Sequence, residues 1–136
     1  MSMKRIISPE VPEVEEGLWS NCIQAGDFLF ISGQVARNVT PDATGVVSTG
    51  IVGDNEYEQT QYTFQRIKHI VEAAGGTMQN IVKMTIYVTD ISKNKEVWRA
   101  RREFFTGDFP TSTLVEVKAL GRPEILVEIE TVAYLK

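Results

Sequence analysis

The segment 125-ILVEIETVAY-134 decides the fold, because it has the pattern of a buried β-strand and carries two carboxylates. Alternate side chains of an extended chain share one face. The two isoleucines and Val127 therefore form one apolar face, whereas Glu128 and Glu130 lie between apolar residues on the other. Two like charges on a half-apolar face require solvent, positive partners or a pocket that uses an acid or a base.

The whole chain, residues 1–136, has the length and composition of one globular domain, with 43% hydrophobic and 24% charged residues. Its formal net charge of -4 disfavours a surface for nucleic acid, so no such partner is expected. A single cysteine, Cys22, cannot form an internal disulfide and suits a reducing compartment, so we expect a cytoplasmic protein. The N-terminus lacks a secretory signal, and no apolar run reaches membrane-spanning length, so no membrane association is expected.

The remaining segments predict an α+β domain in which a mixed sheet carries two helices on one face. The order is strand, strand, loop, helix, strand, helix, strand, strand. The expected ranges are a hairpin over 18–34, a loop with room for one short strand over 37–53, a helix capped by Asp54 over 54–74, a strand over 81–90, a helix capped by Asp90 or Ser92 and ending at Phe105, and strands over 111–120 and 125–134.

The second strand of the predicted hairpin, 28-FLFISGQ-34, mixes aromatic and polar residues. Alternation places Phe28, Phe30, Ser32 and Gln34 on one face. Gly33 then permits close approach of another backbone.

The last two strands are joined by the short connection 121-GRPE-124 and are expected to pair antiparallel. This pairing would place Glu116 and Lys118 across from the face that carries Glu128 and Glu130. Two interpretations of that face remain open. It is either a salt-linked outer surface of an edge strand or the wall of an acid–base pocket.

One face of the predicted sheet has no helix to cover it. The strands over 81–90 and 125–134 keep apolar residues on both sides, and the two helices cover only one side. We therefore expect another subunit to cover the second face.

The sequence lacks the residues of common metal and cofactor sites. Its one histidine and one cysteine cannot form a zinc site of ordinary composition, and it has no glycine-rich phosphate-binding or dinucleotide motif. His69 falls on the polar face of the predicted helix, and Cys22 has the setting of a small buried residue rather than a nucleophile. No metal and no cofactor are expected.

Several ordered segments carry a resemblance that covers almost the whole chain. They are 32-SGQ-34, 72-EAAGGTMQNIVKMTIYVTD-90, 104-FF-105, 109-FP-110, 114-LVEVKAL-120 and 126-LVEIETVA-133. In order and spacing these segments resemble the RidA (YjgF) family of imine/enamine deaminases. No single segment is decisive, and the ordered set carries the resemblance.

The resemblance implies a chorismate-mutase-like α+β fold assembled as a homotrimer, with one pocket at each subunit boundary. In that family the pocket takes short-lived 2-imino or enamine acids and hydrolyses them to the 2-oxo acid and ammonia. Neither a cofactor nor a metal takes part. The implied trimer would also cover the bare face of the sheet.

Carried over residue by residue, the resemblance implies a set of site residues. The essential glutamate of the family falls on Glu128, as a general base or proton shuttle that positions water for attack on the C=N carbon. Glu130 is then structural. The family serine and glycine fall on Ser32 and Gly33, and the position of a family tyrosine holds Trp19.

The sequence departs from the family at the arginine that grips the substrate carboxylate, where it has Ser112. A neutral serine cannot replace a charge-assisted contact. The backbone from Ser112 to Leu114 is expected to help hold water. The family helix carries Asn and Tyr where this chain has Trp98 and Arg101, so the outer pocket is expected to be reshaped.

Three consequences of the missing arginine remain open. In the first, another cation holds the carboxylate, with Arg37, Arg101 and Arg122 as candidates. In the second, the substrate lacks a carboxylate, and Trp19 offers an aromatic face to it. In the third, the protein is a non-catalytic trimer that binds a small metabolite or has a regulatory role. Relatives have also been labelled ribonucleases, but an acidic chain with one histidine does not favour RNA as a substrate.

Overall fold

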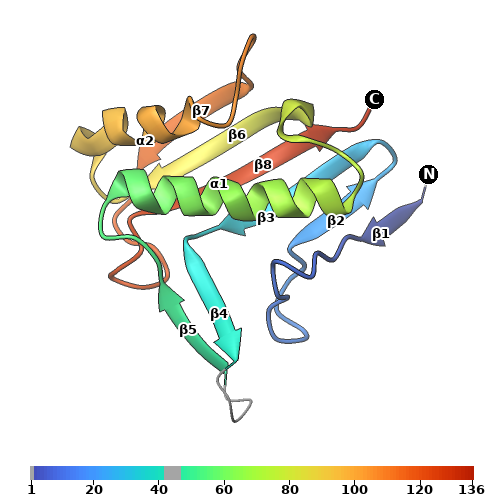
Figure 1. Ribbon diagram of the computed structural model, residues 1–136, viewed down its shortest axis with the longest axis horizontal. Coiled ribbons are helices and arrows are strands. Elements are labelled where there is room, and N and C mark those ends of the chain that lie inside the picture. The colour runs from blue at the N-terminus through green and yellow to red at the C-terminus, as the bar shows by residue number, and fades with distance from the viewer. Residues whose placement is uncertain (1, 42–46) are drawn as a thin grey trace.

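The computed structural model describes residues 2–41 and 47–136, which form a six-stranded mixed sheet, a separate two-stranded hairpin and two α-helices (Figure 1). The strand order of the sheet is β1-β2-β3-β8-β6-β7. The elements are β1 (Met3–Arg5), β2 (Cys22–Ala25), β3 (Phe28–Gln34), β4 (Arg37–Pro41), β5 (Val47–Ile51), α1 (Glu56–Ala73), the 3-10 helix η1 (Met78–Asn80), β6 (Ile81–Val88), the 3-10 helix η2 (Ile91–Lys93), α2 (Asn94–Arg101), β7 (Thr111–Glu116) and β8 (Val127–Tyr134).

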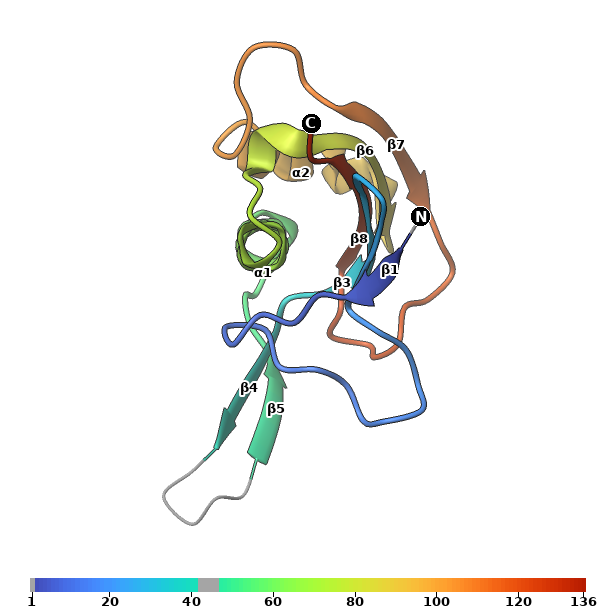
Figure 2. The ribbon, with the colours of Figure 1, turned by 90° about the vertical axis from the view of Figure 1, so that its right-hand side faces the viewer.

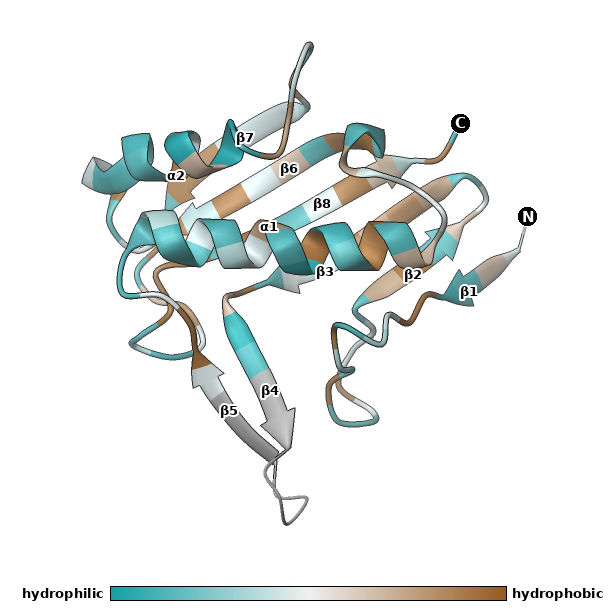
Figure 3. Cartoon of the chain, viewed as in Figure 1, coloured by the Kyte–Doolittle hydropathy of each residue, from teal (hydrophilic) through white to brown (hydrophobic). Residues whose placement is uncertain are grey.

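Both helices lie on the same side of the sheet, and the β4–β5 hairpin projects away from it (Figure 2). The α+β prediction, with two helices on one face of a mixed sheet, is therefore confirmed. The core lies between α1 and the sheet, where Phe64 and Ile67 meet Leu29, Ile86 and Ile129, all fully buried. Burial of each such side chain contributes about 1.5–3 kcal/mol. Hydrophobic bands cross the strands, whereas α1 and α2 are largely hydrophilic (Figure 3).

No helix of the described residues covers the opposite face of the sheet. Phe28, Phe30 and Tyr134 lie there as neighbouring aromatic rings, and Phe30 keeps 51% of its surface exposed. Exposed apolar patches of this kind mark interaction sites. The expectation of a covering subunit remains a prediction.

The predicted antiparallel pairing of the last two strands is wrong. β7 runs parallel to β6 at the edge of the sheet, and β8 lies between β3 and β6. The reason is burial, because β7 is largely exposed while every second residue of β8 is buried, and the more apolar strand takes the interior. Glu116 consequently lies away from Glu128 and accepts a hydrogen bond from the Ile91 backbone N–H at 3.0 Å.

Sequence-based boundaries also needed correction. The segment expected as a loop with one short strand forms the antiparallel hairpin of β4 and β5. The N-cap of α1 is Asn55 rather than Asp54, because the Asn55 side chain accepts from the Glu58 backbone N–H. The second helix ends at Arg101 rather than Phe105 and follows a 3-10 turn capped by Asp90. The edge strand β1 was not predicted.

The face assignment of Gln34 was wrong as well. A β-bulge between Ile31 and Gln34 places two residues of β3 opposite one residue of β8. Gln34 is therefore buried on the helix side, while Phe28 and Phe30 stay exposed on the other.

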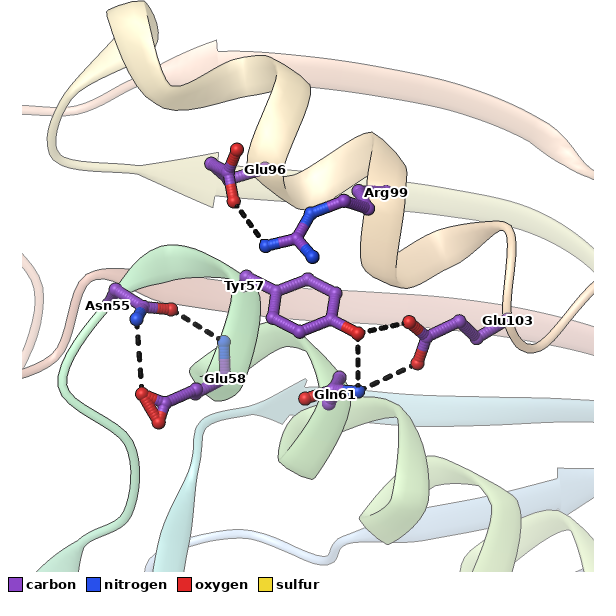
Figure 4. Close-up of polar contacts among 7 residues, drawn as sticks. All are labelled: Asn55, Tyr57, Glu58, Gln61, Glu96, Arg99 and Glu103. Carbon is purple, nitrogen blue, oxygen red and sulfur yellow. Dashed lines mark hydrogen bonds and ion pairs between the residues drawn. The ribbon is translucent and has the colours of Figure 1, made fainter.

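A polar network holds α2 against α1 (Figure 4). The Tyr57 hydroxyl donates a hydrogen bond to Glu103, and the Gln61 amide donates to Tyr57 Oη at 2.9 Å and to Glu103 Oε1 at 2.7 Å. The Arg99 guanidinium lies 3.5 Å above the centre of the Tyr57 ring and pairs with Glu96 at 2.7 Å. These contacts fix the helix that carries two of the predicted site residues.

Neither helix of the described part of the chain is long and apolar enough to cross a membrane.

Candidate active site

The Glu128 side chain, on β8, lies directly on Gly33, which is part of the bulge in the neighbouring strand β3. A Cβ atom at position 33 would lie 2.6 Å from Glu128 Oε2 and 2.9 Å from its Cδ. The close approach permitted by Gly33 is thus made by a side chain rather than by a backbone. Gly33 gives the carboxylate its place by having no side chain.

The Glu128 carboxylate is half-buried and has no hydrogen-bond or ion-pair partner among residues 2–41 and 47–136. Burial raises the pKa of Glu128, and the neighbouring charge of Glu130 raises it further. A carboxyl with a raised pKa can accept a proton and return it at working pH.

Glu130 has a different setting on the same strand face. Its side chain is exposed and accepts a hydrogen bond from the Tyr87 hydroxyl at 2.6 Å. This contact raises the pKa of Tyr87, because the proton is shared with a carboxylate. Of the two carboxylates, Glu128 alone is left without a partner in the described structure.

Glu128 lines a cavity of about 270 Å³ at the end of the sheet next to the β4–β5 hairpin. This volume is just below the range of roughly 300–1,000 Å³ that is usual for small-molecule sites, so the cavity suits a small metabolite. Three of the predicted site residues meet there, namely Trp19, Gly33 and Glu128. Trp19 remains 53% exposed and forms part of the rim.

The same cavity is lined by three arginines from different elements, Arg37, Arg66 and Arg122. None of the three forms an ion pair with Glu128. Arg122 pairs with Glu124 at 3.1 Å, close to it in the chain and exposed to solvent. The cavity therefore separates an acidic group from basic ones.

Arg66 is the site residue that sequence reasoning missed. Its buried guanidinium donates to Gln34 Oε1 at 3.1 and 3.3 Å and to the Arg37 backbone carbonyl at 2.7 Å. Burial and the nearby Arg37 charge lower the pKa of Arg66. A signal was present in the sequence, because Arg66 lies between Thr63 and Ile70 on the buried side of α1.

Ser32 lies beside this cavity rather than in it. Its hydroxyl donates to the Ser20 backbone carbonyl at 2.6 Å and lines an adjacent, more open cavity of about 450 Å³. Glu130 and Lys83 line that second cavity, and Trp19 borders both. Within one chain, the hydroxyl and the backbone N–H of Ser32 thus both donate to carbonyl groups that directly follow Trp19, those of Ser20 and Asn21.

The other four predicted residues lie at the β7 edge of the sheet. Ser112 is paired with Met84 of β6, whereas Glu128 is paired with Tyr87, three residues further along that strand. Ser112 and Leu114 belong to β7, and Trp98 and Arg101 to α2.

One hydrogen bond joins two of the residues at this edge. Arg101 Nη1 donates to Ser112 Oγ at 2.8 Å, and burial lowers the pKa of Arg101. A single chain does not bring this edge to Glu128, so a pocket completed by a second subunit remains a prediction.

No group of three or more His, Cys, Asp or Glu side chains that could hold a metal ion occurs in the described part of the chain. Cys22 is buried, and burial together with the Glu13 charge raises its pKa to about 12, so it is held as a thiol.

Comparisons with known proteins agree with this architecture. The family model described as Endoribonuclease L-PSP matches residues 12–135. The chain is 35% identical to a RutC family protein of Pyrococcus horikoshii, with 97% of this chain and 98% of that protein aligned. It is 32% identical to the 2-iminobutanoate/2-iminopropanoate deaminase of Dermatophagoides farinae over the whole of both chains.

A crystal structure of a conserved Rid family protein, YyfA of Yersinia pestis, superimposes with a TM-score of 0.83 at 32% identity and covers 98% of this chain and 99% of that one. The chain therefore belongs to the RidA/YjgF family, whose family model carries the description Endoribonuclease L-PSP.

Proposed function

We propose that this protein hydrolyses small reactive imines or enamines to a carbonyl compound and ammonia, with Glu128 as the general base. The observation that carries the proposal is the half-buried Glu128 carboxylate, which rests on Gly33 and has no partner in the described structure. The relative named as a 2-iminobutanoate/2-iminopropanoate deaminase supports this class of reaction.

The proposed chemistry uses Glu128 twice. The carboxylate accepts a proton from water as the water oxygen bonds to the C=N carbon, and the nitrogen takes a proton from solvent to give a neutral carbinolamine. The protonated Glu128 then returns its proton to the nitrogen, and the C–N bond breaks as its electron pair leaves with ammonia. The carbinolamine hydroxyl releases its proton to solvent as the carbonyl C=O bond forms. An enamine first gains a proton at carbon and enters as the imine. The raised pKa of Glu128 suits a group that must act as base and then as acid.

The substrate range is proposed to differ from that of relatives that have arginine at position 112. Ser112 carries no charge, and its hydroxyl is already bonded to Arg101. The small cavity beside Glu128 limits the substrate in size, and the exposed Trp19 indole offers a flat aromatic wall at the rim. We further propose that the working form is a cytoplasmic homotrimer in which a second subunit completes each site, as the bare aromatic face of the sheet favours.

The test compares the wild-type protein with Glu128→Gln and Glu130→Gln. Imines are generated in situ by amino-acid and amine oxidases, and loss of the imine is followed in competition with semicarbazide. We expect wild type to accelerate hydrolysis and Glu128→Gln to lose the acceleration. Glu130→Gln removes the same charge from the same strand face and should retain most of it. Equal loss in both variants would contradict the assignment of Glu128.

A second candidate is a non-catalytic trimer of the same fold that binds a small metabolite. The neutral Ser112, engaged by Arg101, favours it. Saturable binding of a 2-oxo acid without acceleration of any imine's hydrolysis would support this candidate over the enzyme.

RNA hydrolysis is not proposed, although the family model carries an endoribonuclease description. The chain has a net charge of -4 and one histidine. That residue, His69, shares a 3.3 Å hydrogen bond with Gln65 on the same helix, away from both cavities lined by Trp19. A single histidine cannot form the pair that phosphodiester chemistry would use.

A further inference from the structure

The cavity beside Glu128 has charges of opposite sign on different walls. Glu128 projects from β8, Arg66 from α1 and Arg37 from β4. In the described residues no ion pair of 4.0 Å or less joins Glu128 to either arginine. The space between them can thus receive a molecule that meets an acid at one end and cations at the other.

Arg66 is unusual for a buried arginine. Buried charges are normally paired with an opposite charge. The guanidinium of Arg66 instead donates to two uncharged oxygens, those of the Gln34 amide and the Arg37 carbonyl. Its positive charge is therefore hydrogen-bonded but not neutralised by any carboxylate of the described structure.

Arg37 adds a second positive charge to the same wall. Its Nε atom is shielded from solvent and has no hydrogen-bond partner. Two guanidinium groups next to each other repel, and this repulsion contributes to the lowered pKa of Arg66. An anion bound beside them would offset the like charges.

We propose that Arg37, supported by Arg66, forms an anion-binding wall that holds the carboxylate of a small substrate whose C=N group faces Glu128. This inference rests on the proposed function and names the substrate class, which is a small imine or enamine that carries a carboxylate. The planar fork of a guanidinium matches a carboxylate in bidentate geometry. The cation would then come from the hairpin and α1 rather than from β7.

The other candidate cations fit less well. Arg122 is exposed and already paired with Glu124. Arg101 is bonded to Ser112 at the β7 edge and does not line the Glu128 cavity of its own chain. Among the described residues, only Arg37 and Arg66 line this cavity and also form no ion pair with a carboxylate.

The test measures binding separately from turnover. Titration calorimetry on the full-length protein uses 2-oxobutanoate, a hydrolysis product of the proposed reaction, and the neutral 2-oxobutanamide of the same shape. We expect wild type to prefer the anion by about ten- to a hundredfold, the effect of one hydrogen-bonded charge. Arg37→Gln should remove most of this preference, and Arg37→Lys should restore part of it. The matched control Arg102→Gln, at an exposed position, should keep the preference.

A second measurement does not depend on the folding of Arg37→Gln. The side-chain Nε–H signal of Arg37 in a ¹⁵N spectrum, assigned by its loss in Arg37→Lys, should shift on addition of 2-oxobutanoate and not of the amide. An unshifted signal would overturn the proposal. So would loss of the anion preference in Arg101→Gln but not in Arg37→Gln, because this result would place the anion at the β7 edge.

These outcomes are distinguishable from failure of the proposed function. A protein that binds 2-oxobutanoate through Arg37 but hydrolyses no imine retains the anion-binding wall and is not a deaminase. A protein that hydrolyses imines but prefers neither carboxylate-bearing imines nor 2-oxobutanoate over their neutral analogues is a deaminase that lacks the anion-binding wall.

Discussion

Substitution of Gly33 by alanine tests whether the observed position of Glu128 is the one that the chemistry uses. The backbone of Gly33 does not have a positive φ, so alanine introduces no backbone strain. The new Cβ would lie 2.6 Å from Glu128 Oε2, and the carboxylate must retreat by roughly 0.8 Å to reach ordinary contact at 3.4 Å. The end of a glutamate side chain can make this movement, so the cost in stability should be small, about 1 kcal/mol or less.

The cost in activity should be much larger, because a misplacement of about 1 Å can reduce a rate by about a hundredfold. We therefore expect Gly33→Ala to keep a melting temperature near that of wild type while hydrolysis of in situ generated imines falls by about two orders of magnitude. Gly50→Ala is the matched control, because a Cβ there meets nothing within 4 Å and its φ is not positive. Full activity in Gly33→Ala would refute the argument that Gly33 sets the working position of Glu128.

Three further outcomes are expected. Because burial raises the pKa of Glu128, the charged carboxylate opposes folding at neutral pH. Glu128→Gln should therefore raise the melting temperature at pH 7. The gain in melting temperature should shrink as the pH falls toward 4.5, the ordinary pKa of a glutamate. Ser112→Arg should lower the melting temperature by placing a second guanidinium beside Arg101, and the added change Arg101→Tyr should restore it. Cys22, with its pKa raised to about 12, should react with a thiol reagent at pH 8 only in denaturant; rapid reaction of the native protein would contradict its burial.

Elements with a strong local pattern could be predicted from the sequence. The alternation in 125–134 correctly separated the buried Val127 and Ile129 from the two glutamates. The turn at Gly26, whose φ is 60°, joins the predicted hairpin of β2 and β3. In α1 the apolar residues Phe64, Ile67 and Val71 recur at helical spacing, and all three are buried.

Long-range pairing could not be predicted in the same way. A short connection between β7 and β8 suggested that they pair, but the order of strands depends on how all six share the core. The cavity was harder still. Arg37 lies in a segment whose composition indicated a loop, and Arg66 comes from the middle of a helix, so only the folded chain shows that they meet.

The bulge at Ser32 and Gly33 changes which residues of β3 face the helices. Up to Ile31 the even-numbered residues of β3 face away from the helices, and after the bulge Gln34 faces toward them, where it receives Arg66. Loss of Ser32 or Gly33 would remove the bulge but would keep Gln34 on the helix side, because Gln34 would then follow Ile31 by two positions. It would instead remove or displace Gly33, on which Glu128 rests. The spacing of this strand is thus as much a part of the site as the residues in it. Related chains that use this arrangement should tolerate substitutions in β3 far better than insertions or deletions.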